Sequence, residues 1–552
     1  MRLMSPGTPA ARELSPARRA SWFNTTCATL RDSMSVSTIV GVAGALLLVA
    51  LLLVPPLPWN FRLPLYLAAF VWTILRPQAA LYLMAICVPW GSLDYINAGG
   101  LRLDSADVLV VFLVAGWLVQ FVLPAQVRAR VRDETPPPRY LVLAMLALLF
   151  TMLLSTGIAI NVKDSLKEIS KWIEVLVIFL LGSQYLRTRR QIWTLIVFIC
   201  LAAISQAIFG YLQAFLNLGP QSFIRSSALR VYGTFDQPNP YAAYINMPLS
   251  IAIALTLLGR GWLTHILAGI TAIMLLYAEI LSQSRGGELA LIAAVAFILF
   301  FGIRAVRVVM RLGIFAILGV IAATLTGHLP SSLTDKLFTF LGLNNISLSA
   351  PSPQDYSTAE RLAHWIAGIN MFFTHPILGV GIGNYPDAYP LFYVTIFVDP
   401  LGHAHNYYIN VAAEMGLIGL VVYLIFVLAI FVAGGSAILH RHRRYKAALA
   451  MPREVRRPVE WPLGTRQKAR LLMRPIGFVQ EYRRQRPVTI RTTLANDRAL
   501  AIGLVAALVT VAAHNLVDDV YVHSLTNLIA LLLIALIRLE RVTPDQSKHR
   551  SM

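Results

Sequence analysis

Seven widely separated residues carry the side chains that phosphate binding and proton transfer require. They are Arg225, Arg230, Arg285, His403, His405, His514 and Asp518. Arginine binds phosphate oxygens through paired hydrogen bonds and stabilises a departing diphosphate. A neutral histidine can accept the proton of an attacking hydroxyl near neutral pH. This combination predicts the transfer of a group from a diphosphate-activated donor to a hydroxyl.

The chain that must position these residues has the composition of a polytopic membrane protein. Of its 552 residues, 57% are hydrophobic and only 13% are charged, which excludes an ordinary soluble globule. Apolar runs of about 17 to 25 residues can cross roughly 30 Å of hydrocarbon. We therefore expect an all-α fold with about fourteen transmembrane helices (12 to 14), centred on residues 36–54, 61–75, 78–92, 107–123, 140–158, 172–185, 191–213, 241–258, 262–281, 287–303, 312–327, 406–433, 499–516 and 522–538.

Basic residues set the expected orientation, because they gather in alternate connections. The clusters are Arg128, Arg130, Arg132 and Arg139; Arg187, Arg189 and Arg190; Arg260; Arg304, Arg307 and Arg311; and the largest, between Arg441 and Arg498. The positive-inside rule makes these connections and both termini cytoplasmic. The residues with candidate chemistry then all fall at or beyond the outer surface. The net charge of +20 is accounted for by topology and by contact with anionic lipids, so we expect no nucleic-acid partner.

Six segments follow from this topology. We expect a basic cytoplasmic tail (1–35), N-terminal transmembrane helices (36–200), a core (201–435) with a long extracytoplasmic loop (328–404), a basic cytoplasmic loop (436–498), C-terminal transmembrane helices (499–540) and a cytoplasmic tail (541–552). The three cysteines, Cys27, Cys87 and Cys200, suit neither a disulfide framework nor a zinc pattern. We expect no cofactor and no metal.

Two outer segments carry the arginines, and each has a plain structural alternative. Residues 217–240 place Arg225 and Arg230 before a run of turn formers that enters a helix, whose first N–H groups can face an anion. The alternative is a simple loop capped at Asn239. Arg285 lies in a tight turn between two apolar helices, where it either snorkels to headgroups or faces a polar cavity. The glycines after it would let an anionic group approach the backbone.

The loop 328–404 is expected to form a lid. Residues 360–373 have amphipathic periodicity, and the glycine-rich run 375–385 is typical of a tight turn and not of a dinucleotide loop. His403 and His405 follow. Two histidines at this spacing can be metal ligands, but no third ligand is apparent in the sequence, so a single histidine acting as general base is favoured over a metal site.

The next helices add further polar residues. His514 and Asp518 lie at the outer end of the thirteenth predicted helix. Asp518 either orients a catalytic partner or caps the turn.

At these positions the sequence resembles the O-antigen ligase and O-antigen polymerase superfamily of bacterial inner-membrane glycosyltransferases. His405-Asn406 is followed after nine residues by Gly416 and after two more by Gly419, the spacing of the ligase signature, although Leu420 stands where a threonine is often expected. The resemblance covers roughly residues 200–435, with a weaker echo at 514–518. Supporting motifs are Arg230 with Gly233-Thr234-Phe235 and Pro238-Asn239, Ser284-Arg285-Gly286, and His375-Pro376 with the glycines after it.

The resemblance implies metal-independent, inverting transfer of a glycan from undecaprenyl diphosphate to an acceptor hydroxyl on the periplasmic or outer face of the bacterial inner membrane. Arg230 and Arg285 would bind the diphosphate, and His405 would activate the acceptor. Further candidates for binding the diphosphate or the acceptor are Arg225, Asn239, Arg361, His403, Asn406, His514 and Asp518. The acceptor is the lipid A core, a second lipid-linked glycan or a protein serine or threonine. We favour the first two, because no extra module marks a protein-directed enzyme.

The competing function is transport, by a flippase for lipid-linked oligosaccharides or by another polytopic carrier. A carrier places ionisable residues near the bilayer midplane, often in broken helices. Here the charges gather at one edge, which favours a one-sided active site beneath a lid, open sideways to lipid. The transferase prediction requires Arg230, Arg285, His405 and Asp518 to converge in space.

Overall fold

The computed structural model describes residues 59–93, 95–98, 101–122, 135–225, 228–326, 347–352, 355–450, 476–522 and 524–541. The chain forms two compact units, residues 1–66 and 67–552, and the boundary falls inside helix α3 (Trp59–Leu75). The predicted tail 1–35 and the predicted span 36–54 lie outside the described residues.

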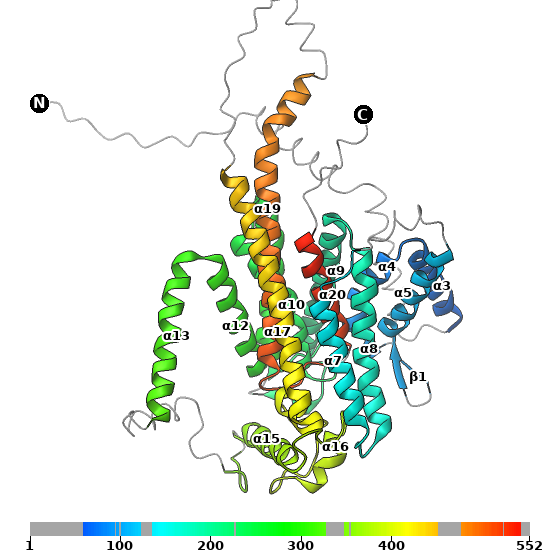
Figure 1. The fold of residues 1–552 in the computed structure, drawn as a ribbon, viewed down its shortest axis with the longest axis vertical. Helices are drawn as coiled ribbons and strands as arrows, with labels where there is room; N and C mark the ends of the chain where they lie inside the picture. Colours follow the sequence, from blue (N-terminus) through cyan, green and yellow to red (C-terminus); the bar gives the residue numbers. More distant parts are fainter. Residues whose placement is uncertain are drawn as a thin grey trace, which may run out of the picture. The chain divides into compact units, whose positions relative to one another are not determined.

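The described part of the second unit is almost entirely helical, which confirms the expected fold class (Figure 1). Its helices are α4 (Gln78–Trp90), α5 (Ser105–Val122), α7 (Arg139–Thr156), α8 (Val162–Tyr185), α9 (Arg189–Leu216), α10 (Pro238–Leu258), α11 (Trp262–Ser282), α12 (Arg285–Gly302), α13 (Arg304–Leu325), α15 (Tyr356–Thr374), α16 (Tyr385–Ala388), α17 (Tyr407–Ala450), α19 (Ile476–His514) and α20 (Leu525–Arg541). The strands form two antiparallel hairpins, β1 (Tyr95–Ala98) with β2 (Leu101–Asp104) and β3 (Ile224–Arg225) with β4 (Ala228–Leu229).

Each predicted span within the described residues coincides with a helix. Among those residues, eight helices are long and apolar enough to cross a membrane: α7, α9, α10, α11, α12, α13, α17 and the part of α19 from residue 490. The other predicted spans correspond to shorter apolar helices such as α4 and α5, to the 17-residue α20, or to α8, which carries several charged residues. The chain is a multi-pass membrane protein.

Helices α10 and α19 form the centre of the second unit. Helix α10 is buried along nearly its whole length and packs against α11, α12 and α19, and α17 also packs against α19. A helix that is apolar on all sides is stable only when other helices surround it. The loop before α10 and the turns at the ends of α11, α17 and α19 are therefore brought together.

Helix α19 connects two polar clusters. Asp497 forms ion pairs with Arg189 at the start of α9 and with Arg441 in α17, at 2.7 and 3.6 Å. His514 ends the same helix, 17 residues later, which corresponds to about 25 Å at 1.5 Å per residue. This separation approaches the thickness of the hydrocarbon layer. The basic residues and the candidate chemistry thus lie toward opposite ends of the helix, as the topology requires, and which end faces the cytoplasm stays a prediction.

The spacing of the ligase signature has a structural cause. Gly416 interrupts α17 with φ 62° and ψ −161°, and a Cβ there would lie 2.4 Å from the carbonyl of Ile377. The carbonyls that the break frees accept hydrogen bonds from the glycine-rich turn: Ala413 from Val380 at 2.9 Å, and Glu414 from Gly381 at 3.0 Å. The break in α17 therefore holds the glycine-rich turn against this helix.

The predicted amphipathic stretch of the loop 328–404 is helical, whereas the role of this loop as a lid stays a prediction. Helix α15 covers the predicted amphipathic stretch, with Ala363 and Ala367 buried and Ile366 and Phe373 exposed. The glycine-rich run forms the predicted tight turn, in which Gly379, Gly381 and Gly383 all have positive φ. Residues 327–346 lie outside the described part.

The basic segment 436–498 differs from the expected loop. Helix α17 continues to Ala450 and α19 begins at Ile476, so both ends of this segment are helical extensions. Residues 451–475, like the final residues 542–552, lie outside the described part of the chain.

Candidate active site

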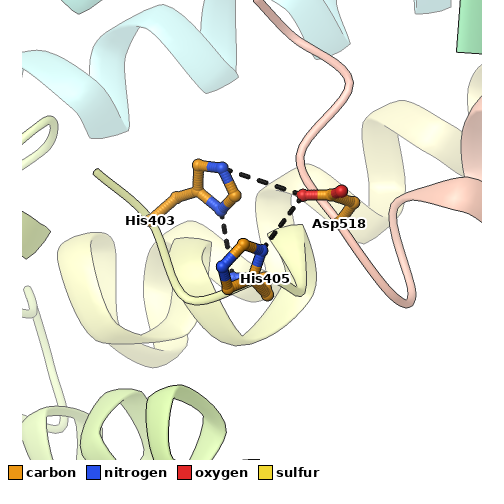
Figure 2. A group of neighbouring side chains, drawn as sticks. All are labelled: His403, His405 and Asp518. Carbon is orange, nitrogen blue, oxygen red and sulfur yellow. Dashed lines mark hydrogen bonds and ion pairs between the residues drawn. The ribbon is translucent and has the colours of Figure 1, made fainter. Parts of the chain in front are cut away.

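Two histidines and an aspartate form a compact cluster between the loop before α17 and the turn after α19. His405 Nδ1 lies 3.2 Å from Asp518 Oδ1, and His403 Nε2 lies 3.7 Å from the same oxygen (Figure 2). The backbone N–H of His405 donates to His403 Nδ1 at 3.1 Å. The predicted convergence of His405 with Asp518 is therefore present.

The hydrogen bonds determine the tautomer of His405. A carboxylate can only accept, so the proton of neutral His405 resides on Nδ1 and its Nε2 carries a lone pair. This Nε2 is buried and has no hydrogen-bond partner among the described residues. The backbone of His405 has φ 51°, a conformation that a non-glycine residue adopts only when its surroundings enforce it. Trp365 Nε1 donates to the His405 carbonyl at 3.2 Å and helps to do so.

Asp518 also connects the histidines to the predicted arginine. Its Oδ2 accepts from Asn239 Nδ2 at 2.7 Å, and Asn239 Oδ1 in turn accepts from Arg230 NH2 at 3.2 Å. Ser284 Oγ donates to the same Asn239 oxygen at 3.1 Å, and Arg230 Nε donates to the Ser282 carbonyl at 3.1 Å. Asn239 is not the helix cap of the plain-loop alternative, since Gln237 is the N-cap of α10. Asn239 lies in the first turn of the helix and joins Asp518 to Arg230.

The environment keeps Asp518 ionised and His403 neutral. Burial alone would raise the pKa of Asp518, but the hydrogen bond from His405 and the neighbouring histidines outweigh it and hold that pKa well below its usual value. Burial lowers the pKa of His403 to about 4, with the carboxylate of Asp518 opposing the shift. The adjacent carboxyl behaves differently: burial, the largest effect, raises the pKa of Asp519 to about 7. Asp518 is therefore the carboxylate that stays charged beside His405.

Arg285 lies beside the cluster without contacting it. It is the first residue of α12, and its side chain is exposed, with no hydrogen bond or ion pair among the residues that the structure describes. The glycines that follow have a packing role: a Cβ on Gly286 would lie 3.1 Å from His514 Nε2, and one on Gly287 would lie 2.3 Å from Glu279 Oε1. We expected these glycines to admit an anion, and instead they admit neighbouring side chains.

The lower-ranked candidates have varied positions. Asn406 caps α17 by accepting from the backbone N–H groups of Tyr408 and Ile409 at 3.0 and 3.1 Å, and it donates to the Leu516 carbonyl. His514 is buried at the end of α19. Arg361 on α15 is partly buried, and its positive charge contributes to the lowered pKa of His403. The backbone of Arg225 is in β3, and its side chain is outside the described part.

Sequence analysis missed His364. It lies on the buried face of α15 together with Ala363, Ala367 and Met371, and its ring packs perpendicular to that of His405 with the centroids 5.5 Å apart. The available signal was a histidine on the apolar face of a predicted amphipathic helix, a position that an ordinary core residue also occupies.

His403, His405 and Asp518 have the geometry to hold a metal ion, because one ligand atom from each lies within 4.8 Å of the others. The sequence indicated only the two histidines, and the third ligand comes from more than a hundred residues away. Histidine nitrogens with one carboxylate oxygen form a donor set that suits Zn²⁺. The same three groups also form a hydrogen-bonded general base.

Part of the chain matches a known protein family. Residues 270–424 match the family model described as O-antigen ligase. The resemblance to the O-antigen ligase and polymerase superfamily is confirmed. This O-antigen ligase region includes α12, α15, His403 and His405, whereas Arg230, Asn239 and Asp518 lie outside it. Comparison with curated proteins finds no match to the chain. The O-antigen ligase region supports a glycosyltransferase function of the ligase or polymerase kind for this membrane protein.

Proposed function

We propose that the protein transfers a glycan from undecaprenyl diphosphate to an acceptor hydroxyl at the periplasmic face of the bacterial inner membrane. The observation that carries the proposal is the 3.2 Å contact between His405 Nδ1 and Asp518 Oδ1, with His405 Nε2 left without a partner among the described residues. A histidine held in one tautomer by a carboxylate is suited to accept a hydroxyl proton.

The transfer proceeds as a single displacement. The acceptor hydroxyl gives its proton to His405 Nε2 while its oxygen attacks the anomeric carbon of the donor glycan. The bond from that carbon to the diphosphate oxygen breaks, and undecaprenyl diphosphate leaves with the bonding electrons. Attack from the side opposite the leaving group inverts the anomeric configuration. Asp518 stabilises the imidazolium that forms, without taking up the proton itself.

Positive charge must face the departing diphosphate, and two arginines supply it. Arg230 is held in place by Asn239 and Ser282, which makes it a preorganised donor. The exposed side chain of Arg285 makes no such contact with the residues that the structure describes, so it can extend toward a diphosphate that arrives from the membrane. Arg361 on α15 adds charge near His403. Because guanidinium groups neutralise the leaving group, the proposal assigns no step to a metal.

The lipid partners follow from this arrangement. The polyprenyl tail stays in the bilayer while the diphosphate reaches the arginines, and α15 covers the histidine cluster. Since His405 Nε2 is covered here, α15 or neighbouring side chains must move before an acceptor reaches it. The acceptor is the lipid A core or a second lipid-linked glycan.

Transfer of a radiolabelled glycan tests the proposal. Purified protein is given a synthetic undecaprenyl diphosphate donor, crude envelope acceptors and EDTA. Wild type is compared with His405→Ala, with Arg285→Ala and with the control His375→Ala, which changes an exposed histidine at the end of α15. We expect EDTA-resistant transfer in wild type and control, and loss of transfer in the other two variants.

Absence of transfer to any envelope acceptor, with donor binding retained, would contradict the proposal. A translocation assay in liposomes would then test the flippase function that the sequence left as the alternative. Transfer that EDTA abolishes and Zn²⁺ restores would instead assign His403, His405 and Asp518 to a metal site.

A further inference from the structure

His364 has a defined tautomer that leaves one nitrogen without a donor. Tyr385 has a single hydroxyl proton, which it donates to the His364 carbonyl at 3.0 Å. The same hydroxyl lies 3.1 Å from His364 Nδ1. When its proton goes to the carbonyl, the hydroxyl accepts from Nδ1–H, and we assign this tautomer to His364. His364 Nε2 therefore carries a lone pair. It is buried and has no hydrogen-bond partner among the described residues.

Two neighbouring imidazole rings thus each have an Nε2 without a hydrogen-bond partner among the described residues. His405 Nε2 is likewise a buried acceptor without a partner among the described residues, and the two imidazoles pack edge to face with centroids 5.5 Å apart. Stacking on Tyr389, at 4.6 Å and 14°, holds the His364 ring in place. A buried acceptor without a hydrogen-bond donor destabilises the conformation that excludes water from it. Separation of the rings by a ligand with hydroxyl donors would relieve both acceptors together.

We infer that His364 is the second hydroxyl-binding residue of the acceptor site, and that the acceptor presents two neighbouring hydroxyls, one to His405 Nε2 and one to His364 Nε2. This inference rests on the proposed function for the role of His405. The hydroxyl at His405 becomes the nucleophile, whereas the hydroxyl at His364 keeps its proton and positions the acceptor. His364 is thus a binding and positioning residue.

The ligand chemistry follows from the number of donors. A pyranose carries adjacent hydroxyls on one rigid ring and can satisfy both nitrogens at once. A serine or threonine side chain carries one hydroxyl and leaves the second nitrogen dry. The site should therefore prefer sugar acceptors with a free vicinal diol over hydroxyl-bearing peptides.

Two substitutions separate the functions of the His364 ring. In His364→Asn, the side-chain NH2 can take the place of Nδ1–H beside Tyr385, and the acceptor at the Nε2 position is lost. In His364→Gln, the longer side chain can return an oxygen acceptor to the Nε2 position. His375→Asn is the matched control, because His375 is exposed at the end of α15. Thermal unfolding of each variant reports whether it is folded.

The measurement is equilibrium binding of small probes to full-length protein in nanodiscs, without donor. The probes are methyl glucopyranoside, galactopyranoside and mannopyranoside, their monodeoxy analogues, and N-acetylserine amide. Shifts of 15N-labelled histidine resonances report contact with each nitrogen. We expect a glycoside with a vicinal diol to move the Nε2 signals of both His364 and His405. Removal of one hydroxyl of that pair should weaken binding about tenfold.

The variants test whether the same hydroxyl contacts His364. His364→Asn should weaken binding of the diol about tenfold and should leave binding of the matching monodeoxy analogue unchanged, whereas His364→Gln and His375→Asn should bind close to wild type. Equal weakening of every probe in His364→Asn, tight binding of N-acetylserine amide, or no binding of any glycoside would overturn the inference. Coupled diol binding without glycan transfer would contradict only the proposed function, and transfer without this coupling would contradict only the role of His364.

Discussion

His405 and Asp518 are in hydrogen-bond contact at 3.2 Å although 113 residues separate them in the chain. The start of α17 and the turn after α19 are joined beside this contact: Asn406 Nδ2 donates to the Leu516 carbonyl at 2.9 Å, and the Tyr407 N–H donates to the Asn515 carbonyl at 2.8 Å. One side-chain and one backbone hydrogen bond thus hold the two segments together beside the dyad, which is the preorganisation that general base catalysis requires.

Asp518→Asn should reduce the kcat of glycan transfer at least about a hundredfold. An asparagine can donate to His405 Nδ1, which would move the imidazole proton to Nε2 and remove the lone pair that accepts the hydroxyl proton. Initial rates with saturating donor measure the effect. Asp387→Asn, at an exposed aspartate in α16, is the control and should retain wild-type rates. A kcat for Asp518→Asn within threefold of wild type would rule out this role.

Arg285→Ala should lower kcat/KM for the lipid diphosphate donor about a hundredfold and leave the melting temperature unchanged. The side chain is exposed, so its removal affects the bound diphosphate and not the fold. Arg304→Ala removes an exposed arginine at the start of α13, two residues after α12 ends, and is the matched control. Equal donor kinetics in the two variants would show that Arg285 serves only as a headgroup anchor.

Arg230→Ala should behave differently, with loss of both activity and stability. The substitution removes the side-chain donor to the carbonyl of buried Ser282 and one of two donors to Asn239 Oδ1, which keeps its bond from Ser284; an unsatisfied buried carbonyl costs about 1–3 kcal/mol. Thermal unfolding in detergent measures the change. A melting temperature equal to that of wild type would mean that these contacts do not contribute to the native state.

Gly416→Ala should destabilise the protein by roughly 2 kcal/mol or more, because the added Cβ would meet the Ile377 backbone at 2.4 Å and φ is 62°. Gly435→Ala is the control in the same helix, since nothing lies within 4 Å of its added Cβ. That substitution should be neutral or stabilising. Thermal unfolding of Gly416→Ala and Gly435→Ala measures the difference in stability. Similar melting temperatures of the two variants would contradict the structural role of the kink at Gly416.

Acidification from pH 7 to 5 should remove the stability that depends on neutral His364 and His403, while Asp519, whose pKa burial raises to about 7, acts in the opposite direction. Burial lowers the pKa of both His364 and His403 to about 4, whereas an unfolded histidine titrates near 6.5. Between pH 6.5 and 4 these two histidines bind more protons in the unfolded chain than in the folded one. Their contribution to the free energy of unfolding therefore falls as the pH falls. Between pH 7 and pH 5, protonation of each histidine in the unfolded chain lowers the free energy of unfolding by on the order of 1 kcal/mol. Melting temperatures of wild type and His364→Asn measure the effect.

As the pH falls from 7 to 5, the melting temperature of wild type should fall relative to that of His364→Asn, while His375→Asn should keep the wild-type pH dependence. The control histidine is exposed, so its substitution leaves the buried histidines unchanged. Parallel slopes for wild type and His364→Asn would show that His364 is protonated equally in both states.

Hydropathy was sufficient to predict the helices, because a membrane span needs only a long apolar run. Hydropathy did not predict the ends of helices that contain charged residues. Helix α8 begins ten residues before its predicted span, and α17 extends to Ala450. The small hairpins β1–β2 and β3–β4 were not predicted, since two to four residues produce no periodic signal.

The candidate site was predictable by residue type but not by contact. Arg230, His405 and Asp518 were identified, and the structure connects them through Asn239. Which side chains meet depends on how α10, α12, α17 and α19 pack, which hydropathy does not encode. His364 was missed for the same reason, because only the packing of α15 brings it against His405.

A double-mutant cycle on His405 and Asp518 tests the central claim most directly. Single-turnover glycan transfer is measured for wild type, His405→Ala, Asp518→Asn and the double variant. Thermal unfolding first establishes that each of them is folded. If the carboxylate acts through the imidazole, the double variant should transfer no more slowly than His405→Ala alone, because the two groups act as one unit. Losses that multiply in the double variant would show that the residues act independently, and would contradict the proposed general base.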